Sequence, residues 1–107
     1  MRGEALKGHL EMLLLAALRN GPAHGYGVID DLKRRSEGAF DLQEGTIYPA
    51  LHRLESDGMV ESEWSVEHGR RRRVYMLTRK GRRALEEKTS AWRSFSDAMT
   101  RSLEPAP

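Results

Sequence analysis

The sequence predicts a mainly α-helical fold with a small β-hairpin, on three observations. Three short segments carry the apolar spacing of amphipathic helices, two alternating segments around a Gly-containing turn indicate a hairpin, and a long helical pattern ends the chain. The expected helices cover about residues 6–19, 25–36, 44–57 and 78–103, and the expected strands about residues 60–66 and 72–78. A chain of 107 residues is sufficient for one domain.

The first predicted helix is apolar on nearly every side. Its main stripe follows the i, i+3, i+4, i+7 spacing of a buried face and consists of Leu10, Leu13, Leu14, Ala17 and Leu18. Met12, Leu15 and Ala16 add apolar surface on the other sides. A helix of this kind must be covered all round, and a second subunit is the simplest cover for a small protein.

The second and third predicted helices each bury one face. Tyr26, Ile29 and Leu32 mark that face in the second helix, and the cations at 33–35 suit the dipole at its C-terminal end. In the third helix Ile47, Leu51 and Leu54 form the buried row, and the other face carries Tyr48, Pro49, His52 and Arg53. Pro49 breaks the helical pattern, which either marks a functional site or a helix that starts late.

The hairpin and the last helix follow from residue 60 onward. Val60, Ser62, Trp64 and Val66 alternate with polar residues, as in a half-buried strand, and four consecutive arginines lie at the tip of the hairpin. Thr78 is a suitable N-cap for the last helix, in which Leu85, Trp92 and Met99 are spaced by seven with Phe95 between them. This spacing resembles a short coiled-coil seam.

Three short helices, a hairpin with a basic tip and a long final helix form the order of a winged helix-turn-helix with a long C-terminal dimerisation helix. We expect residues 1–78 to form the winged helix-turn-helix and residues 79–107 the dimerisation helix and tail, as one compact unit. A helix fits the major groove of B-DNA, and a hairpin with cations can lie along the neighbouring backbone or minor groove.

Charge is concentrated in one short segment. The net charge is only +2, whereas residues 70–83 carry eight basic and no acidic side chains. Such a patch indicates polyanion binding, with a solvated charge run as the alternative.

The chain has no cysteine, no paired-histidine spacing and no dinucleotide fingerprint, so we expect no cofactor, no metal site and no enzymatic activity. With no apolar run longer than seven residues and no signal peptide, we expect a cytoplasmic, nucleoid-associated protein without membrane contact.

Three stretches resemble the PadR family of bacterial transcriptional regulators. The most specific is Glu44–Val60 with its Gly-Thr-Ile-Tyr-Pro-Ala-Leu sequence, and His24–Gly27 and Gly69–Gly81 accompany it in the same order. The resemblance implies a dimeric winged-helix regulator whose C-terminal helix packs on the first helix of the partner. Gln43 departs from the Ser that the family often has as the N-cap of its DNA-reading helix, and Gln is a poor cap.

The architecture and the resemblance together predict contacts to double-stranded DNA. Thr46 suits a phosphate or caps its own helix, Pro49 can touch a thymine methyl group, and Arg53 reads guanine or pairs with Asp57. Tyr26 contacts the backbone or packs in the core. Arg79 and Lys80 stand where the helix dipole disfavours cations, which suggests a nearby phosphate. Not all wing arginines can face DNA, and Arg71 with one neighbour is favoured. The expected DNA-binding residues are Thr46, Tyr48, Pro49, His52, Arg53, Tyr26, Arg70, Arg71, Arg72, Arg73 and Lys80.

The remaining apolar residues predict a homodimer and its interface. The expected interface residues are Leu10, Leu13, Leu14, Leu85, Trp92, Phe95 and Met99. The resemblance also implies a small aromatic effector, and Trp92, Phe95 and Met99 either line a pocket for it or form plain dimer core. The predicted function is a sequence-specific, ligand-responsive repressor that acts as a homodimer on an inverted repeat. The alternative is a winged-helix adaptor that binds proteins and no specific DNA.

Overall fold

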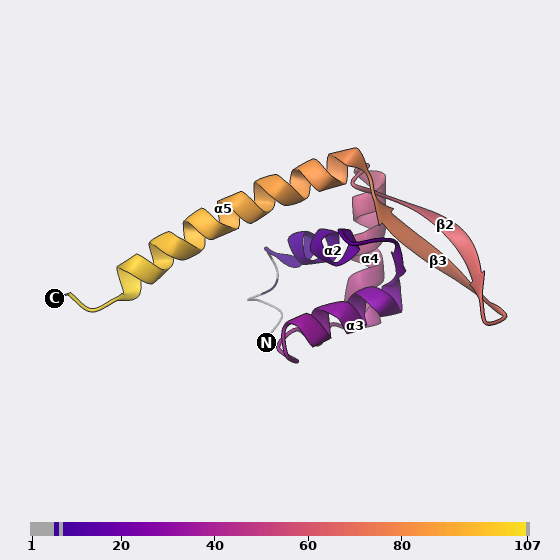
Figure 1. Cartoon of the computed structure of the whole chain (residues 1–107), viewed down its shortest axis with the longest axis horizontal. Helices are drawn as coiled ribbons and strands as arrows, with labels where there is room; N and C mark the ends of the chain where they lie inside the picture. Colours follow the sequence, from indigo (N-terminus) through magenta and orange to yellow (C-terminus); the bar gives the residue numbers. More distant parts are fainter. Residues whose placement is uncertain (1–5, 7, 107) are drawn as a thin grey trace.

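The computed structural model describes residue 6 and residues 8–106, and Figure 1 shows their arrangement. In chain order the elements are α2 (Leu10–Leu18), β1 (Ala23–His24), α3 (Gly25–Arg35), α4 (Glu44–Ser56), β2 (Val60–Glu67), β3 (Arg70–Leu77) and α5 (Arg79–Leu103). The predicted mainly α-helical, winged helix-turn-helix fold is confirmed. The helix expected over residues 6–19 is interrupted by a turn at Gly8 and His9, so that helical Leu6 precedes the turn and α2 begins at Leu10; residue 7 lies outside the described residues.

The strands form one antiparallel sheet in the order β1–β3–β2. The two-residue strand β1 was not predicted, because two residues carry no alternation, and it pairs Ala23 with Tyr75. The β2–β3 hairpin, called the wing below, turns at His68 and Gly69, whose φ angles are 50° and 73°. Positive φ at both central residues matches the right-handed twist of the flanking strands. The four arginines are therefore the first half of β3 and not the turn itself.

The core lies where the three short helices meet the base of the sheet. Leu14, Leu18, Ile47, Leu51 and Leu54 are fully or almost fully buried there. Tyr75 closes the core from the sheet side at 1% exposure. The buried row predicted for α4 is thus confirmed, whereas α2 buries Leu15 and leaves Leu10 and Leu13 partly exposed, and α3 buries Val28 in place of Tyr26.

The wing leaves this core after its first residues. Val60 is 2% exposed, whereas Trp64 is 53% and Val66 is 71% exposed. The prediction of a half-buried strand is correct only at the base of β2, because no helix covers the outer half of the hairpin (Figure 1). Alternation in the sequence cannot show where the covering layer ends.

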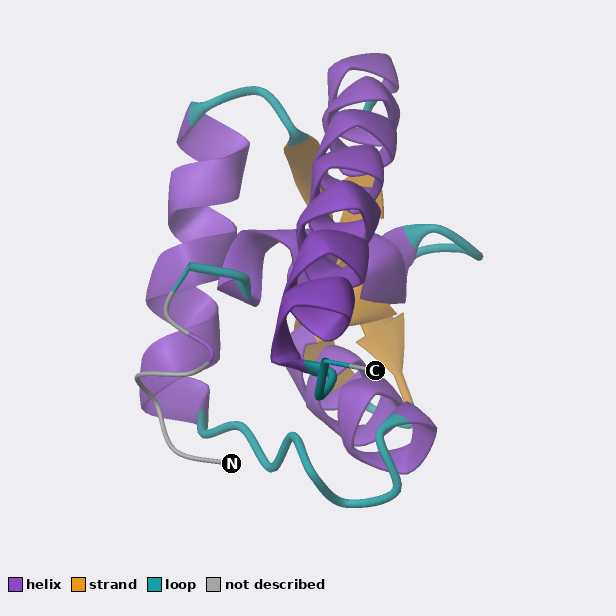
Figure 2. Cartoon of the chain, turned by 90° about the vertical axis from the view of Figure 1, so that its left-hand side faces the viewer, coloured by secondary structure: helices purple, strands orange, loops and turns teal. Residues whose placement is uncertain are grey.

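The junction between the wing and α5 is held by Thr78 and Gly81. Thr78 Oγ1 accepts a hydrogen bond from the Gly81 backbone N–H at 3.0 Å, so the predicted N-cap is confirmed. Thr78 Oγ1 also donates to the Gly58 carbonyl at 2.6 Å, which ties the start of α5 to the loop after α4. From this anchor α5 runs along the upper side of the molecule in the view of Figure 1 and extends beyond the other helices, toward the viewer in Figure 2, so the protein measures 62 × 28 × 21 Å.

Candidate nucleic-acid interface

The outward face of α4 presents a short set of polar and small side chains. Thr46, Pro49 and His52 are exposed, whereas Ile47 and Leu51 on the opposite side are buried. The helix starts at Glu44 without a side-chain cap from Gln43, as that residue type predicts. Pro49 lies inside the helix, so the interpretation of a late-starting helix is wrong. The outward face is thus free to enter a groove.

Arg53 lies on the flank of α4 and not on its outermost face. It lines a cavity of about 450 Å³ between α2 and α5, together with His9, Trp92 and Phe95. His52 and Pro49 remain the outermost side chains in the second turn of the helix, since they stand opposite the buried row. This placement makes Arg53 a link between α4 and the cavity, and His52 the more direct candidate for base contacts.

Two tyrosines stand where α3 and α4 approach each other. The ring of Tyr48 lies on the backbone of Gly25, where a Cβ atom would come within 2.5 Å of its Cζ atom. Tyr26 is 52% exposed, so the alternative that it packs in the core is wrong. A hydrogen bond to Glu44 and the charge of that carboxylate raise the pKa of Tyr26, while burial and then Glu44 raise the pKa of Tyr48. Both phenols therefore stay protonated near neutral pH; the Tyr48 hydroxyl can donate to a phosphate, and the Tyr26 hydroxyl can do so once it leaves Glu44.

Two of the wing arginines, Arg71 and Arg73, stack on Trp64. The Arg71 and Arg73 guanidinium groups lie 4.5 and 5.3 Å from the centre of the Trp64 ring. Arg73 also donates to Ser62 Oγ at 2.8 Å and stands 3.8 Å from the Glu55 carboxylate of α4, so this arginine ties the wing to α4. Arg71 has no such anchor among the described contacts and keeps its charge free. Cation–π contact of this kind limits the number of positions that each guanidinium adopts.

The other two wing arginines point toward α3. Arg72 lies 5.9 Å from the centre of the Tyr26 ring and 2.8 Å from His24 Nε2, and Arg70 is exposed. A second cavity, of about 480 Å³, opens between the wing, α3 and α4, and we call it the wing–α3 cavity. Its lining residues are His24, Tyr26, Tyr48, Trp64, Arg70, Arg71, Arg72 and Arg73.

Lys80 has a structural partner at the opposite end of α4. Its Nζ donates to the Asp57 carbonyl at 2.6 Å, where the helix ends and its dipole is negative. This contact gives the cation at the start of α5 a partner within the protein, in the position where the sequence suggested a nearby phosphate. The eight basic residues of 70–83 are divided between β3 and the start of α5.

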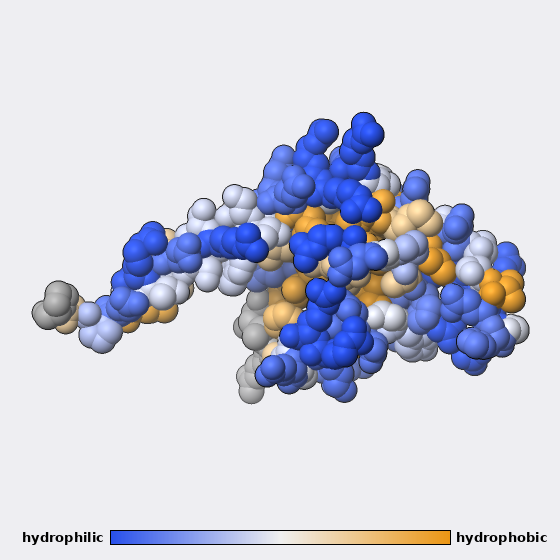
Figure 3. All heavy atoms as spheres, viewed as in Figure 1, coloured by the Kyte–Doolittle hydropathy of each residue, from blue (hydrophilic) through white to orange (hydrophobic). Residues whose placement is uncertain are grey.

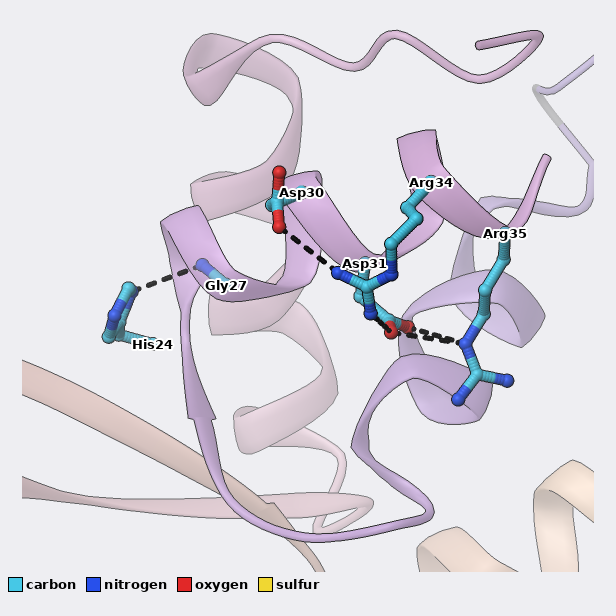
Figure 4. Close-up of polar contacts among 6 residues, drawn as sticks. All are labelled: His24, Gly27, Asp30, Asp31, Arg34 and Arg35. Atoms are coloured by element: carbon cyan, nitrogen blue, oxygen red, sulfur yellow. Dashed lines mark hydrogen bonds and ion pairs between the residues drawn. The ribbon is translucent and has the colours of Figure 1, made fainter. Parts of the chain in front are cut away.

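The cations in the last turn of α3 are also held within the protein. Arg34 pairs with Asp30 and Asp31 at 3.2 and 3.0 Å, and Arg35 pairs with Asp31 at 3.0 Å, as Figure 4 shows. The interpretation that these cations stabilise α3, rather than bind DNA, agrees with these pairs.

The sequence did not single out Trp64 or Glu44 on this surface, and it indicated His24 only as a lesser candidate for phosphate contact. Trp64 was assigned to a buried face, and its pairing with Arg73 depends on the hairpin register, which the sequence does not state. His24 serves as the N-cap of α3, with Nδ1 accepting from the Gly27 N–H at 3.1 Å (Figure 4). A histidine before Gly-Tyr-Gly gives no hint of this role, because His is not a preferred cap residue.

A third surface, on α5, is apolar and is left uncovered by the part of the chain that the structure describes. Trp92, Phe95, Met99 and Leu103 are 40%, 56%, 44% and 75% exposed. In the view of Figure 3, hydrophilic residues follow the upper side of α5 and apolar residues occupy part of its lower side. Midway along its length α5 contacts the segment around α2 through the Lys88–Glu11 ion pair at 3.8 Å and through Trp92, whose ring lies edge-on to His9.

Two residues expected at the dimer interface are instead part of the protomer core. Leu14 is 0% and Leu85 is 3% exposed, so neither has surface left for a partner. Of the three residues expected to line an effector pocket, Trp92 and Phe95 line the cavity between α2 and α5, and Met99 is not among the residues that line it. In the described part of the chain, no helix is both long and apolar enough to cross a membrane.

Comparison with known proteins identifies the family. The model of the transcriptional regulator PadR-like family matches residues 14–87. The chain belongs to this family. A transcriptional regulator of Mycobacterium tuberculosis is 38% identical over 84 residues, which cover 78% of this chain and 76% of that protein. This PadR-family chain is therefore a transcriptional regulator and not an enzyme, as the sequence predicted.

Solved structures of PadR-family proteins share its fold. A PadR family transcriptional regulator from Eggerthella lenta aligns with a TM-score of 0.80 and 34% identity, over 96% of this chain and 88% of that one. Bacillus subtilis PadR in complex with operator DNA aligns with a TM-score of 0.69 and 20% identity, over 92% of this chain and 49% of that one. At that identity the second likeness concerns the fold alone.

Proposed function

We propose that this PadR-family regulator binds double-stranded DNA in a sequence-specific manner, with α4 in the major groove and the wing along the flanking backbone. The observation that carries the proposal is the convergence of Tyr26, Tyr48 and the four wing arginines on one cavity beside the outward face of α4. Cations and phenol donors suit phosphate oxygens, and a free helix face suits base edges. The Bacillus subtilis PadR structure with operator DNA supports this use of the fold.

The proposed contacts divide into two classes. Pro49 and His52 face the bases, with Thr46 at the start of the same face. The backbone contacts come from Tyr26, Tyr48, Arg70, Arg71, Arg72 and Arg73. Arg53 reaches the DNA only from the flank of α4, and Lys80 is left out because it caps that helix at the other end.

We infer that the protein acts as a homodimer through α5. The exposed apolar residues Trp92, Phe95 and Met99 need cover, and a second copy provides it together with the half-exposed Leu10 and Leu13 of α2. A two-fold dimer presents two α4 helices, so its site is an inverted repeat with half-sites about one helical turn apart. Repression then follows where such a site overlaps a promoter.

We also propose that a small aromatic effector binds the cavity between α2 and α5. Trp92 and Phe95 supply apolar rings, while Arg53 brings α4 into the same wall. A ligand that contacts Arg53 has a direct route to the position of α4. If the effector binds the DNA-free protein more tightly than the DNA-bound protein, it lowers the affinity for DNA by shifting α4 away from its DNA-binding position.

Selection from a random duplex library tests the DNA-binding proposal. We expect an inverted repeat to be enriched, and we expect retention on heparin that falls steeply with salt. If ~3–5 phosphates are neutralised per subunit, log K falls by roughly 0.9 per phosphate for each decade of salt. An absence of enriched sequence and of retardation at low salt would support the protein-binding adaptor instead.

A further inference from the structure

The contact between His24 and Arg72 is chemically incomplete. His24 Nδ1 accepts the Gly27 N–H at 3.1 Å, as Figure 4 shows, so this nitrogen carries no proton. A neutral imidazole has one acceptor and one donor nitrogen, so Nε2 carries the proton. Arg72 Nη1 stands 2.8 Å from Nε2 and 3.4 Å from Nδ1, and a guanidinium only donates. The ring therefore has no lone pair left for Arg72.

The alternative tautomer does not remove the problem. A ring with its proton on Nδ1 accepts from Arg72 through Nε2, but Nδ1–H then faces the Gly27 N–H and the cap of α3 is lost. A doubly protonated ring loses the cap as well and adds a positive charge. In each case two donors meet without an acceptor between them.

Arg72 also differs from the other tethered arginines. Within residues 6 and 8–106, Arg34, Arg35 and Arg73 each stand near a carboxylate, whereas the ion pairs include no partner for Arg72. Arg72 is half-buried at the edge of the wing–α3 cavity, and Arg70, Tyr26 and Tyr48 face the same space. Glu44 is the carboxylate that acts on Tyr26 and Tyr48, and it already accepts a hydrogen bond from Tyr26.

We propose that His24 Nε2–H and the Arg72 guanidinium together bind one phosphate group in the wing–α3 cavity. A phosphate oxygen supplies the acceptor that both donors lack, and it leaves the Nδ1 cap of α3 intact. His24 thereby serves two purposes, since one nitrogen caps α3 while the other contacts the anion. The inference rests on the proposed function in taking a DNA backbone phosphate as the ligand, with a free phosphorylated molecule as the other source of the same chemistry.

The tautomer of His24 is the first test and needs no DNA. Nitrogen NMR of the free protein should show Nδ1 unprotonated and Nε2 protonated for His24. Titration with inorganic phosphate should shift the Nε2 resonance in wild type and not in Arg72→Gln. An unprotonated Nε2, or a resonance that ignores phosphate and DNA alike, overturns the proposal even if the protein binds DNA.

The second test measures affinity for a random-sequence duplex at low salt, since backbone contacts are independent of sequence. Arg72→Gln should weaken binding about tenfold and lower the salt slope by about 0.9, the contribution of one phosphate. His24→Ser keeps an oxygen acceptor for the cap and removes the second donor, so it should weaken binding several-fold without changing that slope. The double variant should lose less than the two single losses combined, because both act on one phosphate.

Arg70→Gln provides the matched control. Its guanidinium is exposed on the same strand, one residue before Arg71, and makes no contact with His24 in the described structure. Its effect should add to that of His24→Ser. Equal additivity for Arg70 and Arg72 would refute the shared phosphate. If wild type responds to inorganic phosphate at His24 while Arg72→Gln and His24→Ser bind duplex normally, the ligand is a free phosphorylated molecule, and the proposed backbone contact is wrong while the subsite stands.

Discussion

Gly81→Ala should destabilise the protein, although it places a better helix former inside a helix. In most helices this change gains about 1 kcal/mol. Here the new Cβ atom would stand 2.0 Å from the Met59 carbonyl oxygen and 3.2 Å from Leu77 Cδ2. The carbonyl belongs to backbone that already accepts the Thr78 N–H at 3.1 Å, so it cannot move away without a further loss.

The magnitude follows from the contacts that must yield. Overpacking costs about 1–3 kcal/mol, and disturbance of the Thr78 cap costs about 1 kcal/mol more. After subtraction of the gain in helix propensity, we expect the free energy of unfolding to fall by about 2 kcal/mol and Tm by roughly 10 °C. Urea and thermal unfolding followed by circular dichroism measure both values, at one fixed protein concentration because the protein is expected to dimerise.

Gly27→Ala is a closely matched control. Gly27 and Gly81 are each the third residue of a helix, and each donates its N–H to the side chain of its N-cap residue. A Cβ atom at Gly27 would meet only side-chain atoms, at 3.6 Å or more, which is ordinary contact. This variant should be as stable as wild type or more stable. Equal losses in the two variants, or a stable Gly81→Ala, would show that the packing of α5 on Met59 is not as described.

Four further changes test other parts of the molecule. Gly25→Ala should displace the Tyr48 ring and weaken duplex binding several-fold in fluorescence anisotropy, with a smaller stability loss than Gly81→Ala; unchanged binding would remove Tyr48 from the interface. Arg71→Gln should lower the salt slope of log K by about 0.9; a constant slope would show that this arginine meets no phosphate. Phe95→Asp should shift sedimentation toward a monomer, and a persistent dimer would place the interface elsewhere. Lys80→Met should cost about 0.3–1 kcal/mol in unfolding while leaving the salt slope unaltered; a slope reduced by one phosphate would return Lys80 to the DNA surface.

Much of this surface depends on contacts between elements that are far apart in sequence. Arg73 is joined to α4 through Ser62 and Glu55, and Arg72 meets His24 at a separation of 48 residues. The Trp64 ring lies against the Arg71 and Arg73 guanidinium groups, whereas Arg72 lies against His24. Four identical residues in a row thus acquire different roles, because strand alternation sends them to opposite faces.

The sequence by itself determined helices α2 to α5, the wing and their order, but not the two-residue strand β1. Helical spacing in α4 predicted that Ile47, Leu51 and Leu54 are buried in the core and that His52 is exposed. Thr78 predicted the start of α5 as its N-cap residue. These features are local, since period, capping and turn chemistry act within a few residues.

Only the tertiary structure decided which apolar and charged residues remain available. It buried Leu14 and Leu85 in the protomer, gave Lys80 to the end of α4, turned Arg53 toward the cavity between α2 and α5, and exposed Trp64. Each outcome depends on which element packs against which, and on where a packed layer ends. The sequence states the chemical nature of each side chain. Its exposed area and its contacts depend on residues that are distant in sequence and close only in the folded protein.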